Sequence, residues 1–135
     1  MKHRTKIVVV FLSLIVFLPA AALAQSNQVI DRLLDQEAAS FADARYMVQT
    51  AVAESSPPVP TPQADKSITL GEYAHLLMQS FDIPGGVMYR LFPGPRYGVR
   101  EIAYYGFIRG SHIAGRPVSG REVVNILRRV LEWKE

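Results

Sequence analysis

The chain has 135 residues, no cysteine, and 15 Lys and Arg residues against 12 Asp and Glu residues. The absence of cysteine excludes disulfide bonds, thiol catalysis and cysteine-ligated metal sites. Three of the basic residues lie within the first 24 positions, so the rest of the chain carries 12 basic and 12 acidic residues. This balance argues against nucleic acid as a partner, because nucleic acid binding calls for a clustered basic surface.

The first 24 residues (1–24) have the pattern of a cleavable secretory signal peptide. A short basic stretch precedes an apolar run over residues 7–18, which is about 18 Å long as a helix and too short for a bilayer core of about 30 Å. Ala22 and Ala24 supply the small-x-small motif, which places cleavage before Gln25. An uncleaved anchor is the alternative. We expect export to the periplasm, the cell envelope or the medium, with no stable membrane span after cleavage.

Residues 25–54 are predicted to form one amphipathic helix, followed by a proline-rich linker over residues 55–66, with four prolines in six residues. Residues 25–65 carry a net charge of −4 and residues 66–135 a net charge of +4. We therefore expect the helix to fold back on the C-terminal part, with pairing to another protein as the alternative. Its apolar residues recur every three or four positions: Val29, Ile30, Leu33, Leu34, Phe41, Ala44, Val48 and Val52.

Residues 67–135 are predicted to form a helical domain. Thr69 with Glu72, and Ser119 with Glu122, match capping boxes that begin two amphipathic helices. A Pro/Gly-rich loop over residues 84–95 follows the first of these helices, and a short helix is expected from Tyr97 to Phe107. The predicted fold class is all-α, a small bundle of about four helices joined by Pro/Gly-rich loops.

The two capped starts lie 50 residues apart, and residues 68–77 superimpose on residues 118–127. With the glycine turn at 106–110 between them, this half of the chain resembles S-layer homology (SLH) domains, in which a helix opened by a Thr-Arg-Ala-Glu-like motif pairs with a shorter helix ending in a glycine turn. The family arginine is replaced by Leu70 and Gly120, and the usual Phe-x-Asp-Val…Trp lead-in is absent. SLH modules act as three repeats around a site for an acidic wall polysaccharide, whereas this sequence indicates little more than one repeat.

No catalytic constellation or cofactor motif is found in the sequence. His75 and His112 have no nearby histidine or carboxylate at a metal-site spacing, so no metal site is predicted. Glu72 and Glu122 have the residue type of paired acid–base carboxylates. Their positions as capping-box acids explain them without catalysis, and we therefore predict that the protein is not an enzyme.

A cluster of arginine and tyrosine residues in the C-terminal half is the candidate site for an anion or a glycan. Guanidinium groups offer paired donors to carboxylates and phosphates, and tyrosines offer flat faces and hydroxyls to sugars. The alternative is that the tyrosines pack in the core while the arginines are solvated or pair with acids such as Glu101 and Asp82. The site residues are Arg96, Tyr97, Arg100, Tyr104 and Arg109.

The sequence thus predicts an exported, non-catalytic module of the cell envelope with a structural or interaction role. Its candidate partners are an anionic cell-wall polymer or another envelope protein. The alternatives are a small glycan-acting enzyme of the envelope and a subunit of an envelope protein complex.

Overall fold

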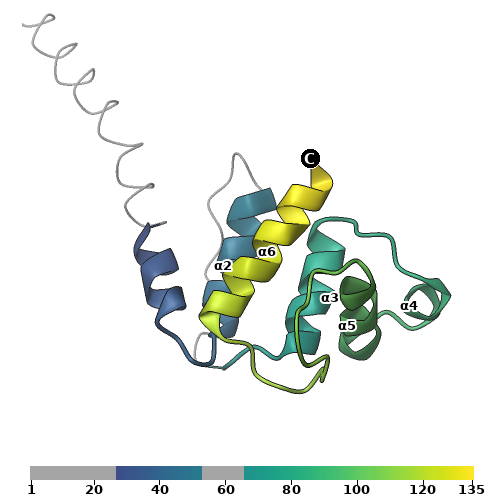
Figure 1. Ribbon diagram of the computed structural model, residues 1–135, viewed down its shortest axis with the longest axis horizontal. Helices are drawn as coiled ribbons and strands as arrows, with labels where there is room; N and C mark the ends of the chain where they lie inside the picture. Colours follow the sequence, from purple (N-terminus) through teal and green to yellow (C-terminus); the bar gives the residue numbers. More distant parts are fainter. Residues whose placement is uncertain (1–26, 53–65) are drawn as a thin grey trace, which may run out of the picture. The chain divides into compact units, whose positions relative to one another are not determined.

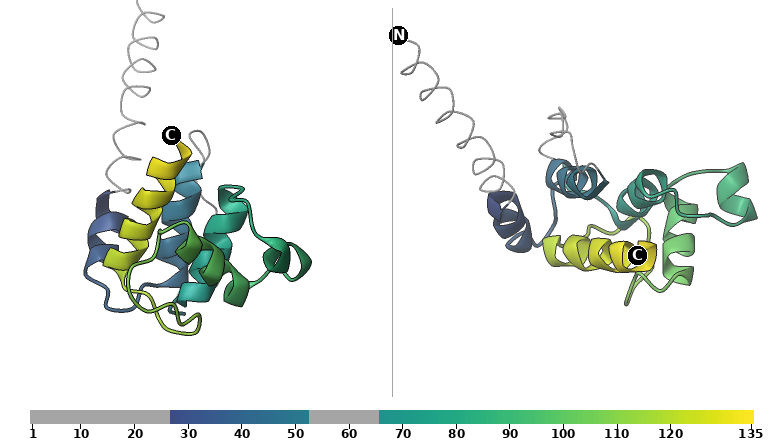
Figure 2. Two further views of the ribbon diagram at one scale, coloured as in Figure 1. Left: turned by 45° about the vertical axis from the view of Figure 1, so that its right-hand side comes forward. Right: turned by 90° about the horizontal axis from the view of Figure 1, so that it is seen from above.

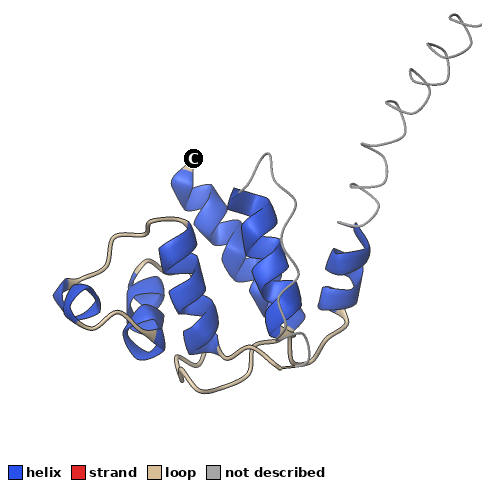
Figure 3. Ribbon diagram, turned by 180° about the vertical axis from the view of Figure 1, so that it is seen from behind, coloured by secondary structure: helices blue, strands red, loops and turns tan. Residues whose placement is uncertain are grey.

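The structure is a computed structural model that describes residues 27–52 and 66–135. The chain divides into two compact units, one ending at Arg32 and the other spanning Leu33–Glu135. The predicted signal peptide and nearly all of the predicted linker lie outside the described residues. Within the described ranges the regular elements are helices, and only isolated bridges of β type occur (Figure 3). The predicted all-α fold class is confirmed.

Five named helices build the second unit (Figure 1), and a further helical stretch covers residues 27–34. The helices α3 and α6 begin directly after Thr69 and Ser119, as predicted. The short helix α5 begins two residues earlier than expected because a proline is well suited to a first helical turn. The helix α4 lies inside the region predicted to be a loop. The helices are α2 (Phe41–Val52), α3 (Leu70–Ser80), α4 (Val87–Leu91), α5 (Pro95–Tyr104) and α6 (Gly120–Lys134).

The prediction of one continuous helix over residues 25–54 is wrong, because residues 35–40 are not helical and separate two helices. Ser40 begins a new helix there: its hydroxyl accepts a hydrogen bond from the Asp43 N–H at 3.1 Å. The Gln36 side chain accepts from the Ser40 N–H at 2.9 Å and donates to the Asp43 carboxylate at 2.9 Å. Such bonds from side chain to backbone compete with helix continuation, and apolar spacing alone does not reveal them.

A closed ring of three backbone hydrogen bonds joins the segments that precede α2, α3 and α6. The Ala39 N–H donates to the Val118 carbonyl at 2.7 Å, the Val118 N–H donates to the Ile68 carbonyl at 3.2 Å, and the Ile68 N–H donates to the Ala39 carbonyl at 2.8 Å. All three residues are fully buried. Three segments that are far apart in the sequence are therefore held at one point, and each uses the others to satisfy its buried backbone.

Each residue of this ring is followed by a hydroxyl residue that caps a helix. Ser40, Thr69 and Ser119 accept from the backbone N–H three residues later at 3.1, 3.3 and 3.3 Å. The helices α2, α3 and α6 thus begin side by side at the ring (Figure 2). Ser40 is thus a third capped start beside the two that the sequence predicted.

The three helices bury equivalent positions, four residues after each cap, in a common core. Ala44, Tyr73 and Val123 are all fully buried. The Tyr73 hydroxyl donates to the Val123 carbonyl at 2.8 Å and so ties α3 to α6, while burial raises the pKa of its phenol. The α2 portion of the predicted N-terminal helix therefore packs on the C-terminal helices, as the charge asymmetry favoured.

The helix α5 packs closely on α3 through Gly98. A Cβ atom at this position would lie 3.2 Å from the backbone nitrogen of His75, so the two helices approach at a distance that favours glycine. Val99 and Ile102 of α5 are buried in the same core. After Gly106, which has a positive φ of 78° and ends the helix as glycine readily does, the chain returns to α6 through a long loop.

A substitution at Gly120 tests the close contact between the start of α6 and the chain before α2. A Cβ atom there would collide with the Leu33 carbonyl, while the Gly120 N–H donates to the Gln36 carbonyl at 3.0 Å. We expect Gly120→Ala to lower the free energy of unfolding of the protein from Gln25 onward by about 3 kcal/mol or more, since neither backbone can move away easily. Urea denaturation followed by circular dichroism measures this loss.

Gly115→Ala is the matched control, because nothing lies within 4 Å of a Cβ at Gly115. It should stay within about 0.5 kcal/mol of the parent. Equal stability of the two variants would show that the close contact at Gly120 is absent in solution.

Candidate functional site

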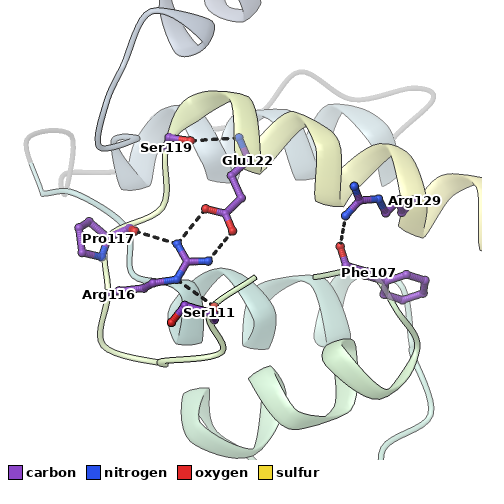
Figure 4. Close-up of polar contacts among 7 residues, drawn as sticks. All are labelled: Phe107, Ser111, Arg116, Pro117, Ser119, Glu122 and Arg129. Atoms are coloured by element: carbon purple, nitrogen blue, oxygen red, sulfur yellow. Dashed lines mark hydrogen bonds and ion pairs between the residues drawn. The ribbon is translucent and has the colours of Figure 1, made fainter. Parts of the chain in front are cut away.

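Arg116 fixes the loop between α5 and the start of α6 (Figure 4). Its Nε donates to the Ser111 carbonyl at 3.0 Å and its Nη1 to the Pro117 carbonyl at 3.3 Å. The same guanidinium pairs with both carboxylate oxygens of Glu122, at 2.8 and 2.5 Å. The hydrogen bond to Glu122 raises the pKa of Arg116 in spite of partial burial. Arg116 is therefore a permanent cation whose donors hold the loop to the helix.

A pocket of about 300 Å³ opens beside this pair, between the loop and α6. Arg129 and Arg109 supply its remaining cations. The Nη1 of Arg129 donates to the Phe107 carbonyl at 2.7 Å (Figure 4), which leaves the rest of its guanidinium for other acceptors. Arg109 is exposed and makes no ion pair or hydrogen bond within the described part of the chain. The lining residues are Arg109, Arg116, Glu122, Asn125, Ile126 and Arg129.

The pocket holds three guanidinium groups against one carboxylate, and Arg116 already neutralises that carboxylate. Arg109 and Arg129 are the groups that can receive an anion, in the paired geometry that guanidinium offers to carboxylates and phosphates. The exposed Asn125 adds an amide that can both donate and accept hydrogen bonds. The site is chemically suited to bind an anion that also carries hydroxyl or amide groups.

An aromatic cluster continues the pocket along α6. Trp133 follows Arg129 by four residues and so lies on the same helical face. Phe107, whose carbonyl Arg129 contacts, stacks on Tyr105 with ring centroids 5.6 Å apart, and Trp133 meets both rings edge-on at 5.4 and 6.0 Å. Tyr104 packs edge-on against Tyr105 and is 86% exposed. Accessible aromatic faces thus adjoin a cationic pocket.

Of the five residues predicted for the anion or glycan site, Arg109 alone lines this pocket. Tyr104 belongs to the adjoining aromatic cluster. Arg96 and Arg100 are exposed on α5, and Tyr97 is half-buried there. The structure therefore does not gather the five into one site.

Sequence reasoning missed four residues to which the site assigns a role: Arg116, Asn125, Arg129 and Trp133. Two of them carried a usable signal, because Arg129 and Trp133 follow Glu122 by seven and eleven residues and so share its face of α6. Arg116 lies in the loop, where no periodicity indicates which side chain a residue meets.

The predicted capping box at Thr69 is confirmed. The Thr69 N–H donates to the Glu72 carboxylate at 2.9 Å, and Lys66 pairs with the other oxygen of that carboxylate at 2.6 Å. At Ser119 the prediction is only half right: the Ser119 hydroxyl caps the helix, but the Glu122 side chain turns to Arg116. Both acids, proposed as candidates for acid–base work, are thus engaged with a cation six residues earlier.

Within residues 27–52 and 66–135, no group of three His, Asp or Glu side chains is placed to hold a metal ion. Across the same ranges, no helix combines the length and the apolar character that a membrane crossing needs. His75 has a different partner: its Nδ1 lies 2.8 Å from the Tyr89 hydroxyl, in a contact between α3 and α4.

The pairing of Glu72 predicts a pH dependence of stability. Burial raises the pKa of Glu72, but hydrogen bonds from Lys66 and Thr69 outweigh it and leave the pKa below the ordinary value of 4.5. A lowered pKa stabilises the fold above the unfolded-state pKa, and this stabilisation disappears as the pH falls through the folded-state value. Glu72→Gln should therefore lower the free energy of unfolding by about 0.5–1 kcal/mol at neutral pH and by less in acid.

Denaturant titrations at neutral pH and at a series of acidic pH values measure the free energy of unfolding of the parent and of Glu72→Gln. The control is Glu132→Gln, since Glu132 pairs with Arg128 on an exposed face of α6, where ion pairs contribute little. A loss for Glu72→Gln that stays constant into acid would contradict the role assigned to the charged carboxylate.

Comparison of the chain with protein-family models, with curated proteins and with solved structures finds no match.

Proposed function

We propose that the chain is an exported, non-catalytic module of the cell envelope that binds an anionic wall polymer. The observation that carries this proposal is the pocket between the loop and α6, where Arg109 has no partner in the described chain and Arg129 uses one donor on a backbone carbonyl. The adjoining Tyr104 and Trp133 supply exposed faces on which a sugar ring can stack. A negatively charged polysaccharide combines the two chemistries.

The arrangement of the helices supports the proposed likeness to SLH domains. The sequence indicated little more than one repeat, whereas three capped helices begin at Ser40, Thr69 and Ser119 around one ring of backbone hydrogen bonds. Within the described residues a shorter helix with a glycine turn follows only α3, so the three starts match the capped helices of the resemblance and not three complete repeats. The replacements at Leu70 and Gly120 remain departures from the family pattern. We infer a divergent SLH-like unit in which the arginine pocket serves for binding.

A non-catalytic role is supported by the state of the two candidate acids. Glu72 closes a capping box and pairs with Lys66, and Glu122 is held by both terminal nitrogens of Arg116. A general acid needs a raised pKa to carry a proton at neutral pH, while the pKa of Glu72 is lowered. Export, through the segment before Gln25, brings such a module to the compartment where wall polymers occur.

Binding to isolated wall material tests the proposal. The protein from Gln25 onward should co-sediment with peptidoglycan or with an acidic wall polymer, and added salt should release it. Arg109→Gln should weaken this binding about tenfold or more, because a charge-assisted hydrogen bond contributes roughly 1.5–3 kcal/mol. Its side chain has no partner in the described chain, so the fold should be unaffected, which a thermal melt checks.

Two control variants make the result specific. Arg121→Gln removes the same charge from an exposed position on α6 outside the pocket and should bind as the parent does. Arg96→Gln with Arg100→Gln tests the site first predicted on α5. Loss of binding in this double variant but not in Arg109→Gln would move the site to α5, and no retention on any wall material would refute wall binding itself.

A further inference from the structure

The helix α4 presents an apolar surface that the rest of the described chain does not cover. None of its residues is buried. Val87 is 71% exposed, Met88 55%, Leu91 64% and Phe92 63%. Figure 1 shows α4 beyond α5, at the end of this unit opposite α2 and α6, and Figures 2 and 3 show the same placement. We call residues 87–92 the α4 arm.

The apolar side chains of the α4 arm lie on one side of it. Val87 and Leu91 are four residues apart, as are Met88 and Phe92, so both pairs stack along one helical face. Tyr89 falls on another side and fastens the arm through its contact with His75. The α4 arm therefore contacts α3 through Tyr89, while its apolar side chains are exposed to solvent on another side.

Arginines occur on the α4 arm and on the neighbouring helix α5; that of the arm, Arg90, also donates its Nε–H to the Gly85 carbonyl at 3.1 Å. Arg90, Arg96 and Arg100 are all exposed, and no acidic residue occurs between Asp82 and Glu101 in the sequence. Glu101 of α5 is an acidic residue beside the start of the arm, since a Cβ at Gly86 would lie 2.9 Å from its Oε1. An exposed apolar face bordered by arginines is the combination that binds the surface of an anionic bilayer.

The same charges disfavour a second copy of the chain as the occupant. A symmetric contact through the α4 arm would bring Arg90, Arg96 and Arg100 of both copies together, and like charges in close contact are unfavourable. The arm is also short: its five helical residues span about 7.5 Å. An arm of this length offers far less surface than a stable protein–protein interface buries, which is about 1,200 Å² or more in total.

We propose that the α4 arm inserts Val87, Met88, Leu91 and Phe92 into the interface of an anionic lipid bilayer while the neighbouring arginines contact lipid phosphates. The protein is then a peripheral membrane binder, independent of the pocket beside α6. The partner is the lipid surface itself, recognised by its negative charge and its accessible acyl chains.

Vesicle co-sedimentation tests this proposal with the protein from Gln25 onward. This form lacks the apolar segment of residues 7–18, which would bind lipid by itself, and it keeps every buried side chain of the core from Leu33 to Val130. We expect binding to vesicles of phosphatidylcholine mixed with phosphatidylglycerol, at least tenfold weaker binding to phosphatidylcholine alone, and release by salt. Leu91→Asp should reduce binding to the mixed vesicles about tenfold or more.

Ile113→Asp is the matched control, since Ile113 is 66% exposed, slightly more than Leu91 at 64%, but lies in the loop before α6. It carries the same change of charge and should bind as the parent does. A second readout uses the single tryptophan of the chain: in a Trp133→Phe background, Phe92→Trp should shift its fluorescence to the blue on anionic vesicles.

Three results would overturn the proposal. Equal binding to both kinds of vesicle would remove the role of the arginines. Equal loss in Leu91→Asp and Ile113→Asp would remove the role of the α4 arm. A dimer in analytical ultracentrifugation that Leu91→Asp dissociates would assign the arm to a second copy of the chain.

Discussion

The ring of backbone hydrogen bonds among Ala39, Ile68 and Val118 is the constraint on which the rest of this unit depends. It fixes where three helices begin, because each ring residue is followed at once by the cap of α2, α3 or α6. A buried backbone donor without a partner is costly, so the three segments cannot separate individually without loss. The core between the helices follows from this junction, with Tyr73 bonded to the backbone of Val123.

The same junction explains which features the sequence could predict. The helices α3 and α6 were predictable because their caps and apolar spacing are local signals that agree with one another. The break before α2 was not predictable. It depends on the hydrogen bond from the Ser40 N–H to the Gln36 side chain and on the bonds of Ala39 to two segments that are distant in the sequence. The helix α4 is too short for periodicity to reveal it.

The candidate site was predictable only in part, for a related reason. Arg109 was identified by residue type, but its neighbours in the pocket depend on the path of the loop that Arg116 secures to Glu122. A loop path is set by long-range contacts rather than by spacing. The third capped start was obscured similarly, since Ala39 and Asp43 stand where the other two starts carry a larger apolar residue and a glutamate.

The order of the ring residues along the chain has a consequence for folding. Ile68 follows Ala39 by 29 residues, and Val118 follows Ile68 by 50, so closing the ring brings together segments across long stretches of chain, at a cost in loop entropy before any gain. During synthesis the ring cannot form until Val118 has been added, 79 residues after Ala39. Until then the three capped helices have no common anchor, and the chain from Ala39 onward stays open.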